Sequence, residues 1–198
     1  YGLVGSEMCI RDRPSTVVPM TTIGVFLGSV RTGRIGSQVG AWVMEAGAER
    51  DADYRLLDLA DFDVPHLDAE VVPGAANKQY DDPVVTRWSE AVDACDGFVF
   101  VTPEYNHSIP GTMKNAFDSL FGEWAGKPVA FVGYGADGGV RAVEHWRQIV
   151  ANLSMTDIRN QVALNIFGED VDDGELSPRE HKQAALTRAL SDLEEKLS

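Results

Sequence analysis

Apolar residues along the chain alternate between short uninterrupted runs and positions spaced three or four apart. Short runs rich in β-branched and aromatic residues predict buried strands, and the wider spacing predicts helices that pack one face on a sheet. Five runs predict strands, at residues 23–27, 54–59, 97–102, 128–134 and 162–166. Helical spacing follows at about 35–46, 83–94, 110–121 and 140–153, and again after Ser177.

The last predicted helix begins with a clear start signal. Residues Ser177 to Glu180 read Ser-Pro-Arg-Glu, which predicts a capping box with proline in the first helical turn. The leucines behind it repeat at helical spacing, at Leu186, Leu190, Leu193 and Leu197.

Regular alternation of strands and helices predicts one α/β domain with a parallel sheet covered on both faces. A chain of 198 residues is long enough to bury a real core, and we place this domain at residues 21–198. Residues 1–20 have neither a core pattern nor the features of a signal peptide. We interpret residues 1–13 as a translated sequencing-adapter remnant and expect the native protein to begin near Met20; the alternative is a natural disordered tail.

The third predicted strand leads directly into a polar tract at residues 103–118, which reads Pro-Glu-Tyr-Asn-His-Ser-Ile-Pro-Gly-Thr-Met-Lys-Asn-Ala-Phe-Asp. In open α/β sheets, ligands bind at the carboxyl ends of the strands. Tyr105 offers a flat ring there, and Asn106 offers an amide. The tract is therefore suited to a planar heteroaromatic ligand with hydrogen-bonding edges, although an ordinary strand-to-helix loop would have the same general form.

A second loop, Gly28 to Ser37, follows the first predicted strand and precedes the first helix. Its glycines and hydroxyls, together with a helix N-terminus, make a natural phosphate-binding site. Arg31 and Arg34 could add charge-assisted contacts. Because the loop lacks the Gly-Lys-Ser/Thr ending of a nucleotide P-loop, we expect it to bind a monophosphate without magnesium.

A third glycine-rich segment, Gly133 to Gly138, satisfies the G-x-G-x-x-G pattern. A dinucleotide fingerprint belongs after the first strand of its unit, whereas this one follows the fourth predicted strand. We therefore interpret it as a turn that lets backbone approach a ligand shared with the other two loops.

The first two loops together resemble a known family. Gly28-Ser29-x-Arg31, combined with the long tract from Pro103 to Asp118, is similar to the NAD(P)H-dependent FMN reductases, which include quinone reductases and relatives that reduce chromate or azo dyes. The resemblance runs from about Thr21 to about Gly168. It implies a flavodoxin-like three-layer sandwich with a five-stranded parallel sheet in the order 2-1-3-4-5.

The resemblance also implies an enzyme that transfers hydride from NADPH or NADH to bound FMN and then to quinone, free flavin or another small electron acceptor. The cofactor supplies the reactive chemistry, so we name no catalytic side chain. The expected phosphate ligands are Ser29, Arg31, Ile35 and Ser37, with Arg34 as a further candidate that could instead face solvent. Pro103, Glu104, Tyr105 and Asn106 are expected along the isoalloxazine edge, and Tyr134, Gly135 and Asp137 on its other side.

The family is typically dimeric or a dimer of dimers, which implies a homodimer or homotetramer here. Phe117, Phe121 and Trp124 lie on or just past the helix that follows the 103–118 tract. So many aromatic residues can exceed what one small core absorbs, and exposed aromatics often mark an interface. We expect these three side chains to take part in subunit contact.

Charge and composition limit the partners. A net charge of −14 argues against nucleic acid, since phosphate backbones require a basic face. No apolar run is long enough for a membrane-spanning helix. Cys9 and Cys95 do not suggest a disulfide framework, so we expect a cytoplasmic protein.

Two residue types in the chain could suggest other chemistry. The four histidines are too scattered to predict a metal site, and His107 is expected at the rim of the ligand crevice without an essential acid–base role. Lys114, Asn115 and Asp118 are expected to stabilise their helix or a subunit contact.

Two other functions remain open from the sequence: a flavodoxin-like FMN electron carrier, whose acidity would suit docking to a redox partner, and a binding module that senses flavin.

Overall fold

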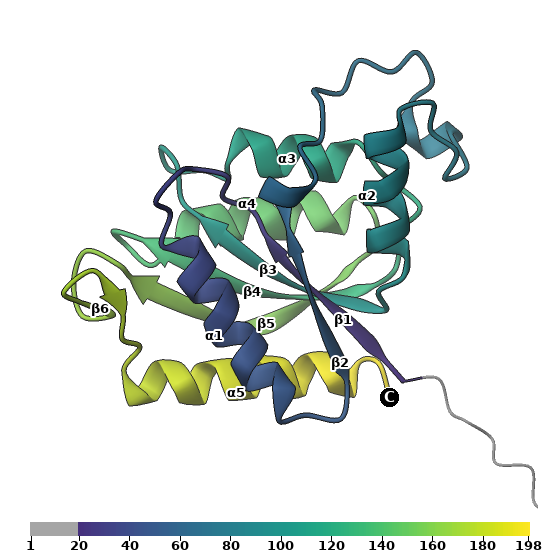
Figure 1. The fold of residues 1–198 in the computed structure, drawn as a ribbon. Helices are drawn as coiled ribbons and strands as arrows, with labels where there is room; N and C mark the ends of the chain where they lie inside the picture. Colours follow the sequence, from purple (N-terminus) through teal and green to yellow (C-terminus); the bar gives the residue numbers. More distant parts are fainter. Residues whose placement is uncertain (1–19) are drawn as a thin grey trace, which may run out of the picture.

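The computed structural model describes residues 20–198 and contains a five-stranded parallel sheet (Figure 1). Its strands are β1 (Thr22–Leu27), β2 (Asp53–Asp58), β3 (Gly97–Pro103), β4 (Pro128–Gly135) and β5 (Thr156–Asn165). They lie in the order β2-β1-β3-β4-β5, as the family resemblance implied. The predictions made for residues 1–19 fall outside the described part of the chain.

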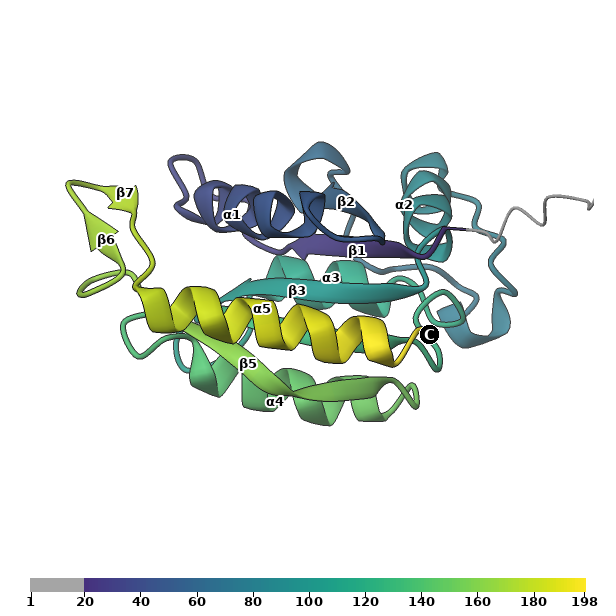
Figure 2. The same cartoon turned by 90° about the horizontal axis from the view of Figure 1, so that it is seen from below.

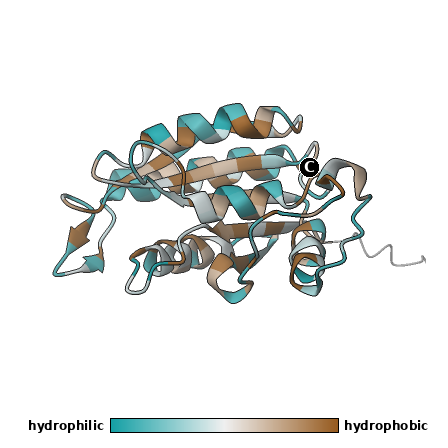
Figure 3. Cartoon of the chain, turned by 90° about the horizontal axis from the view of Figure 1, so that it is seen from above, coloured by the Kyte–Doolittle hydropathy of each residue, from teal (hydrophilic) through white to brown (hydrophobic). Residues whose placement is uncertain are grey.

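Helices cover both faces of the sheet, which gives the expected three layers (Figures 1 and 2). The helices are α1 (Gly36–Ala48), α2 (Pro83–Asp93), α3 (Gly111–Asp118), α4 (Val140–Ala151) and α5 (Glu180–Glu195). One buried cluster joins α1 and α5 to the sheet, and a second joins α2, α3 and α4 to it. Apolar positions follow the strands and alternate with polar ones along the helices (Figure 3), as a helix with one buried face requires.

The fifth strand is longer than the apolar pattern indicated, since β5 begins at Thr156 and the sequence predicted a start at Val162. Its first half reads Thr-Asp-Ile-Arg-Asn-Gln, and most of these side chains are exposed. β5 lies at the edge of the sheet, where polar residues are common because they discourage pairing with another chain. An apolar run therefore finds only the half of this strand that is packed against the helices.

The start of α5 also differs from the prediction. The helix begins at Glu180, after Arg179 in extended conformation, and no side chain caps it. The capping-box prediction was wrong because Ser177 is held elsewhere: its backbone N–H donates to the carbonyl of Asp170 at 2.8 Å. Just before it lies a short hairpin, β6 (Val171–Asp172) and β7 (Glu175–Leu176), which the sequence analysis did not predict and which projects past the sheet (Figure 2).

The expected exposure of the aromatic residues after β3 is mostly wrong. Phe117 and Trp124 are 1% and 0% exposed, and their rings stack with centroids 5.0 Å apart. The Trp124 indole N–H is satisfied by the carbonyl of Phe117. Only Phe121 is exposed, at 40%. A core built from several tryptophans and phenylalanines absorbs the other two, so they cannot serve an interface.

Candidate functional site

Three loops meet at the carboxyl edge of the sheet, on the left of Figure 1. Strand β1 pairs with β3 through Leu27 and Val101, and β3 pairs with β4 through Pro103 and Tyr134. The β1–α1, β3–α3 and β4–α4 loops therefore leave three neighbouring strand ends. Sequence reasoning predicted this convergence, and it creates the crevice in which open α/β sheets bind ligands.

The β1–α1 loop ends in a helix start that has free donors. Ile35 precedes α1 without capping its first turn through a side chain. Among the described residues, no protein group accepts from the backbone N–H of Ile35, Gly36 or Ser37. Unpaired N–H groups and the helix dipole together favour an anion at this position. Ser37 itself is exposed and donates its hydroxyl to the carbonyl of Arg34.

The two arginines of this loop have different surroundings. Arg34 donates to Asp58 at the end of β2, at 2.5 Å, and also to the carbonyl of Ser29. Its side chain is only 15% exposed, so the expectation that it could face solvent was wrong. Arg31 is exposed and makes no hydrogen bond or ion pair with any residue in the 20–198 range. Asp58 is a site residue that sequence reasoning missed, because its role depends on β2 lying beside β1.

The β3–α3 loop carries a tight turn at its tip. Asn106 and His107 both have positive φ, 50° and 65°. Backbone hydrogen bonds run in both directions between Tyr105 and Ser108, as expected for a two-residue type I′ turn. The Tyr105 hydroxyl lies 2.9 Å from the Ser29 hydroxyl. This contact joins the two loops that carry the family resemblance.

Glu104 is directed away from a ligand. Its carboxylate accepts from the Arg141 side chain at 2.6 Å and from the Arg141 backbone N–H at 3.2 Å. Arg141 also pairs with Asp137, so Asp137 serves the start of α4. Pro103 is buried at the end of β3. What Glu104 and Pro103 can offer a ligand is therefore backbone, which matches the expectation for that edge.

The glycines after β4 are required by the protein's own packing. Gly138 and Gly139 have φ values of 73° and 69°. A β-carbon at Gly139 would lie 2.5 Å from the backbone nitrogen of Tyr134, and one at Gly138 would lie 2.8 Å from Ala163. The G-x-G-x-x-G segment thus forms a compressed turn after the fourth strand, beside Gly135.

Tyr134 does not close the crevice on the side that the sequence suggested. Its side chain is buried on the α1 face of the sheet, with its hydroxyl against Gly36. Burial raises the pKa of Tyr134, while the nearby Ser29 hydroxyl lowers it. The net effect keeps the hydroxyl neutral, so it remains a hydrogen-bond donor.

The remaining titratable candidates lie outside this chemistry. The Nδ1 of His145 in α4 is 2.8 Å from the hydroxyl of Ser108, whereas His107 is exposed at the loop tip. Burial raises the pKa of Cys95 to about 11, which leaves this thiol unreactive. Within the part of the chain that the structure describes, no group of histidine, cysteine and acidic side chains could hold a metal ion. In that same part, no helix has the length and apolar character needed to cross a bilayer.

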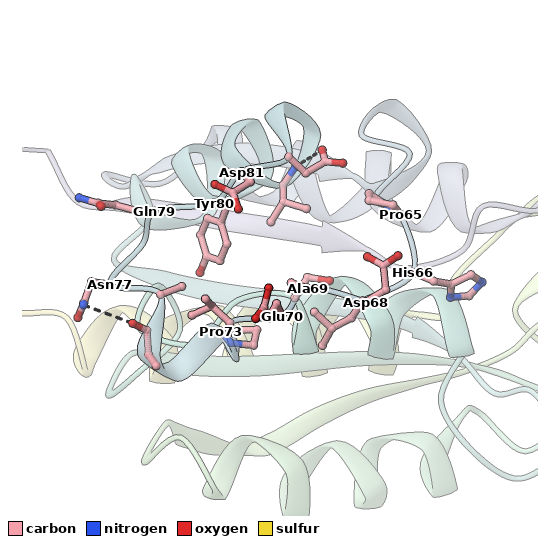
Figure 4. Close-up of a pocket in the computed structure, with 17 residues that line it drawn as sticks. Pro65, His66, Asp68, Ala69, Glu70, Pro73, Asn77, Gln79, Tyr80 and Asp81 are labelled. Atoms are coloured by element: carbon pink, nitrogen blue, oxygen red, sulfur yellow. Dashed lines mark hydrogen bonds between the residues drawn. The ribbon is translucent and has the colours of Figure 1, made fainter.

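A large hollow of about 720 Å³ lies elsewhere, over α2 and α3 (Figure 4). The segment between β2 and α2 forms most of its wall, with Tyr80, Asp81 and Asp68 among the side chains around it. Asn115 in α3 holds this segment by donating to the carbonyl of Pro65 and accepting from the N–H of Leu67. The hollow is separate from the three loops that form the crevice.

Comparison with known proteins places this geometry in context. Residues 21–169 match the family model described as NADPH-dependent FMN reductase. A NAD(P)H-dependent FMN reductase from Nectria sp is 43% identical over 62% of this chain and 64% of its own length, so the chain spans just under two thirds of that relative. A quinone reductase from Escherichia coli strain K12 is 35% identical over 64% of this chain and 68% of its own.

The solved structure of FerB, a flavoenzyme NAD(P)H:(acceptor) oxidoreductase from Paracoccus denitrificans, superposes with a TM-score of 0.69 at 23% identity. It covers 88% of this chain and 96% of that one, which shows a common fold.

Proposed function

This chain belongs to the NADPH-dependent FMN reductase family, and from that membership we propose that its three-loop crevice binds FMN and uses NADPH or NADH to reduce a small-molecule acceptor. The observation that carries the proposal is the meeting of the Gly28–Ser37 and Pro103–Asp118 segments at one edge of the sheet. The quinone reductase relative supports a quinone as one acceptor class.

The residues present fit the phosphate of FMN. The N–H groups of Ile35, Gly36 and Ser37 have no protein acceptor, and Arg31 is exposed beside them with no partner in the described chain. Four donors without an acceptor complement a dianion. Ser29 would hold the loop against Tyr105 through the hydroxyl contact at 2.9 Å.

The ring system would lie along the β3–α3 loop. Backbone groups of Pro103, Glu104 and Asn106, together with the Tyr105 ring, would orient its polar edge, and Gly135 would allow close approach from β4. When bound, FMN supplies the hydride chemistry. The side chains in the crevice bind and orient the cofactor, and we assign none of them a catalytic acid–base role.

Purified protein tests this function directly. The visible spectrum should show flavin, and cofactor released by denaturation should co-migrate with FMN on chromatography. Anaerobic addition of NADH or NADPH, without another protein, should bleach the flavin, and a quinone should restore its colour. Flavin that nicotinamide cannot bleach would favour an electron carrier, and protein that binds flavin without turnover would favour a sensing module. FAD as the stoichiometric cofactor would contradict the proposal.

We also propose that the protein forms at least a homodimer, with a homotetramer as the larger alternative. The exposed apolar side chains that support this are Leu67, Val71, Val72 and Phe121. Light scattering at working concentration tests the assembly, and Val71→Asp combined with Phe121→Asp should give a monomer if these residues lie in the contact. A monomeric wild-type protein would contradict the proposal. The cytoplasmic location stays a prediction, testable by fractionating the host cell.

A further inference from the structure

The phenolic oxygen of Tyr134 is buried and has no hydrogen-bond partner among the described residues. Tyrosine hydroxyls in protein interiors are normally paired, because an unpaired one has lost its contacts with water and gained nothing in exchange. The other side-chain atom in this condition within residues 20–198 is the indole nitrogen of Trp42, nearly two turns further along α1. Only Tyr134 has its unpaired atom beside the phosphate loop.

The position of this oxygen is defined by Gly36, the first residue of α1. A β-carbon at Gly36 would lie 2.3 Å from the Tyr134 oxygen, so the absence of a side chain there allows the hydroxyl to reach the helix start. Burial raises the pKa of Tyr134, so the hydroxyl keeps its proton near neutral pH and can donate it in a hydrogen bond.

The surroundings of this hydroxyl are rich in donors and lack an acceptor. The N–H groups of Ile35, Gly36 and Ser37 belong to the same helical turn and donate to no described residue. The neighbouring Ser29 hydroxyl is within hydrogen-bond distance of Tyr105. A group with several anionic oxygens would satisfy all these donors together, whereas a neutral or cationic group would not.

We propose that the Tyr134 hydroxyl donates a hydrogen bond to the phosphate of FMN at the N-terminus of α1. The inference rests on the proposed function and makes it more specific, because it moves Tyr134 from the ring side of the cofactor to the phosphate side. Tyr134 comes from β4 and the other phosphate donors from the β1–α1 connection, so the phosphate would join two separate parts of the sheet edge.

Riboflavin, which has the same ring and no phosphate, provides the test. Tyr134→Phe should weaken FMN binding by about 10- to 100-fold, as expected for a hydrogen bond to a charged group. The dissociation constant for riboflavin should stay within about twofold, because the ring contacts are unchanged. The apoprotein should unfold at the same urea concentration or a higher one, since the variant removes a hydroxyl that has no partner. Binding is measured by quenching of flavin fluorescence.

Tyr54→Phe is the matched control. The Tyr54 hydroxyl donates to Glu194 at 2.8 Å, so its loss should destabilise the apoprotein and leave the affinities for FMN and riboflavin unchanged. Equal FMN affinity in wild type and Tyr134→Phe would overturn the inference and leave the proposed function intact. Equal losses for FMN and riboflavin would also overturn it, because they would place Tyr134 at the ring. Failure of the wild type to bind FMN would overturn both.

Discussion

Arg31 and Arg34 stand three residues apart in one loop, and the structure gives them different tasks. Arg34 is paired with Asp58, so much of its charge is already compensated within the protein. Arg31 has no such partner in residues 20–198, and its charge is available to an incoming anion. The sequence predicted both as phosphate ligands. It could not predict the Asp58 contact, since this pair is 24 residues apart and meets only because β2 lies beside β1.

Removal of the free arginine should affect the cofactor and spare the fold. We expect Arg31→Ala to weaken FMN binding by about 10- to 100-fold, because a charge-assisted hydrogen bond contributes about 1.5–3 kcal/mol. Fluorescence quenching measures the affinity. Arg188→Ala, which removes an exposed arginine from α5, is the control for net charge and should leave binding unchanged. If the two variants bind FMN equally well, Arg31 is not a phosphate ligand.

Removal of the paired arginine should affect the apoprotein itself. We expect Arg34→Ala to lower the free energy of unfolding by about 1.5–3 kcal/mol, because Asp58 is left largely buried without its partner. Urea unfolding measures this change. Replacing Asp58 as well, in Arg34→Ala/Asp58→Ala, should recover part of the loss.

The control for this pair is the exposed ion pair between Lys78 and Asp93. Lys78→Ala should change the stability by no more than about 0.5 kcal/mol, as is usual for a solvent-screened pair. A loss in Arg34→Ala no larger than that in Lys78→Ala would show that the Arg34–Asp58 pair does not stabilise the loop.

Among the elements, the connection between β2 and α2 depends most on contacts from outside itself. It contains only two short 3-10 turns, Leu59–Asp61 and Pro73–Ala75. The two hydrogen bonds from Asn115 join it to α3. The sequence expected Asn115 to stabilise its helix or a subunit contact, whereas its side chain serves a distant loop. Sequence periodicity describes each element alone, so a contact of this kind leaves no local signal.

Loss of this clamp should loosen the loop locally. We expect Asn115→Ala to speed amide hydrogen exchange at Leu67 by about tenfold, because the N–H loses its acceptor. Asn115→Asp keeps a side-chain oxygen for Leu67 and loses the donor to Pro65, so it should preserve most of the protection at Leu67. Equal exchange in the wild type and Asn115→Ala would contradict the role of the clamp.

The elements themselves could be predicted where packing determines them. The four strands with long buried stretches were predicted within one or two residues, because both faces of each are covered by helices. The edge strand β5 and the start of α5 were not. Exposed polar residues form the first half of β5, and the buried carboxylate of Asp170 accepts from the N–H of Asn165 in the turn before α5. Edge strands and long-range side-chain contacts lie outside what hydrophobic patterning can detect.

At the scale of the molecule, the strand order places the ligand loops together and leaves α5 to close the opposite face. That helix is attached to the rest of the domain through Glu194, which accepts from Arg50 at 2.7 Å and from Tyr54 at 2.8 Å. Burial raises the pKa of Glu194, but the hydrogen bonds from Arg50 and Tyr54 outweigh it, and the net pKa is lowered. The charged form is therefore the one that the folded state prefers.

This lowered pKa predicts how stability responds to acid. A carboxylate whose pKa is lower in the folded state stabilises the protein above its unfolded-state pKa, and the stabilisation is lost as the pH falls through the folded-state pKa. We expect Glu194→Gln to lower the free energy of unfolding by about 1–2 kcal/mol near neutral pH, discounted for partial exposure. The gap between wild type and variant should narrow as the pH falls below about 4.5. Urea unfolding over this pH range measures it, with the exposed neighbour in Glu195→Gln as the control. A gap that stays constant with pH would mean that the charge on Glu194 does not hold α5 in place.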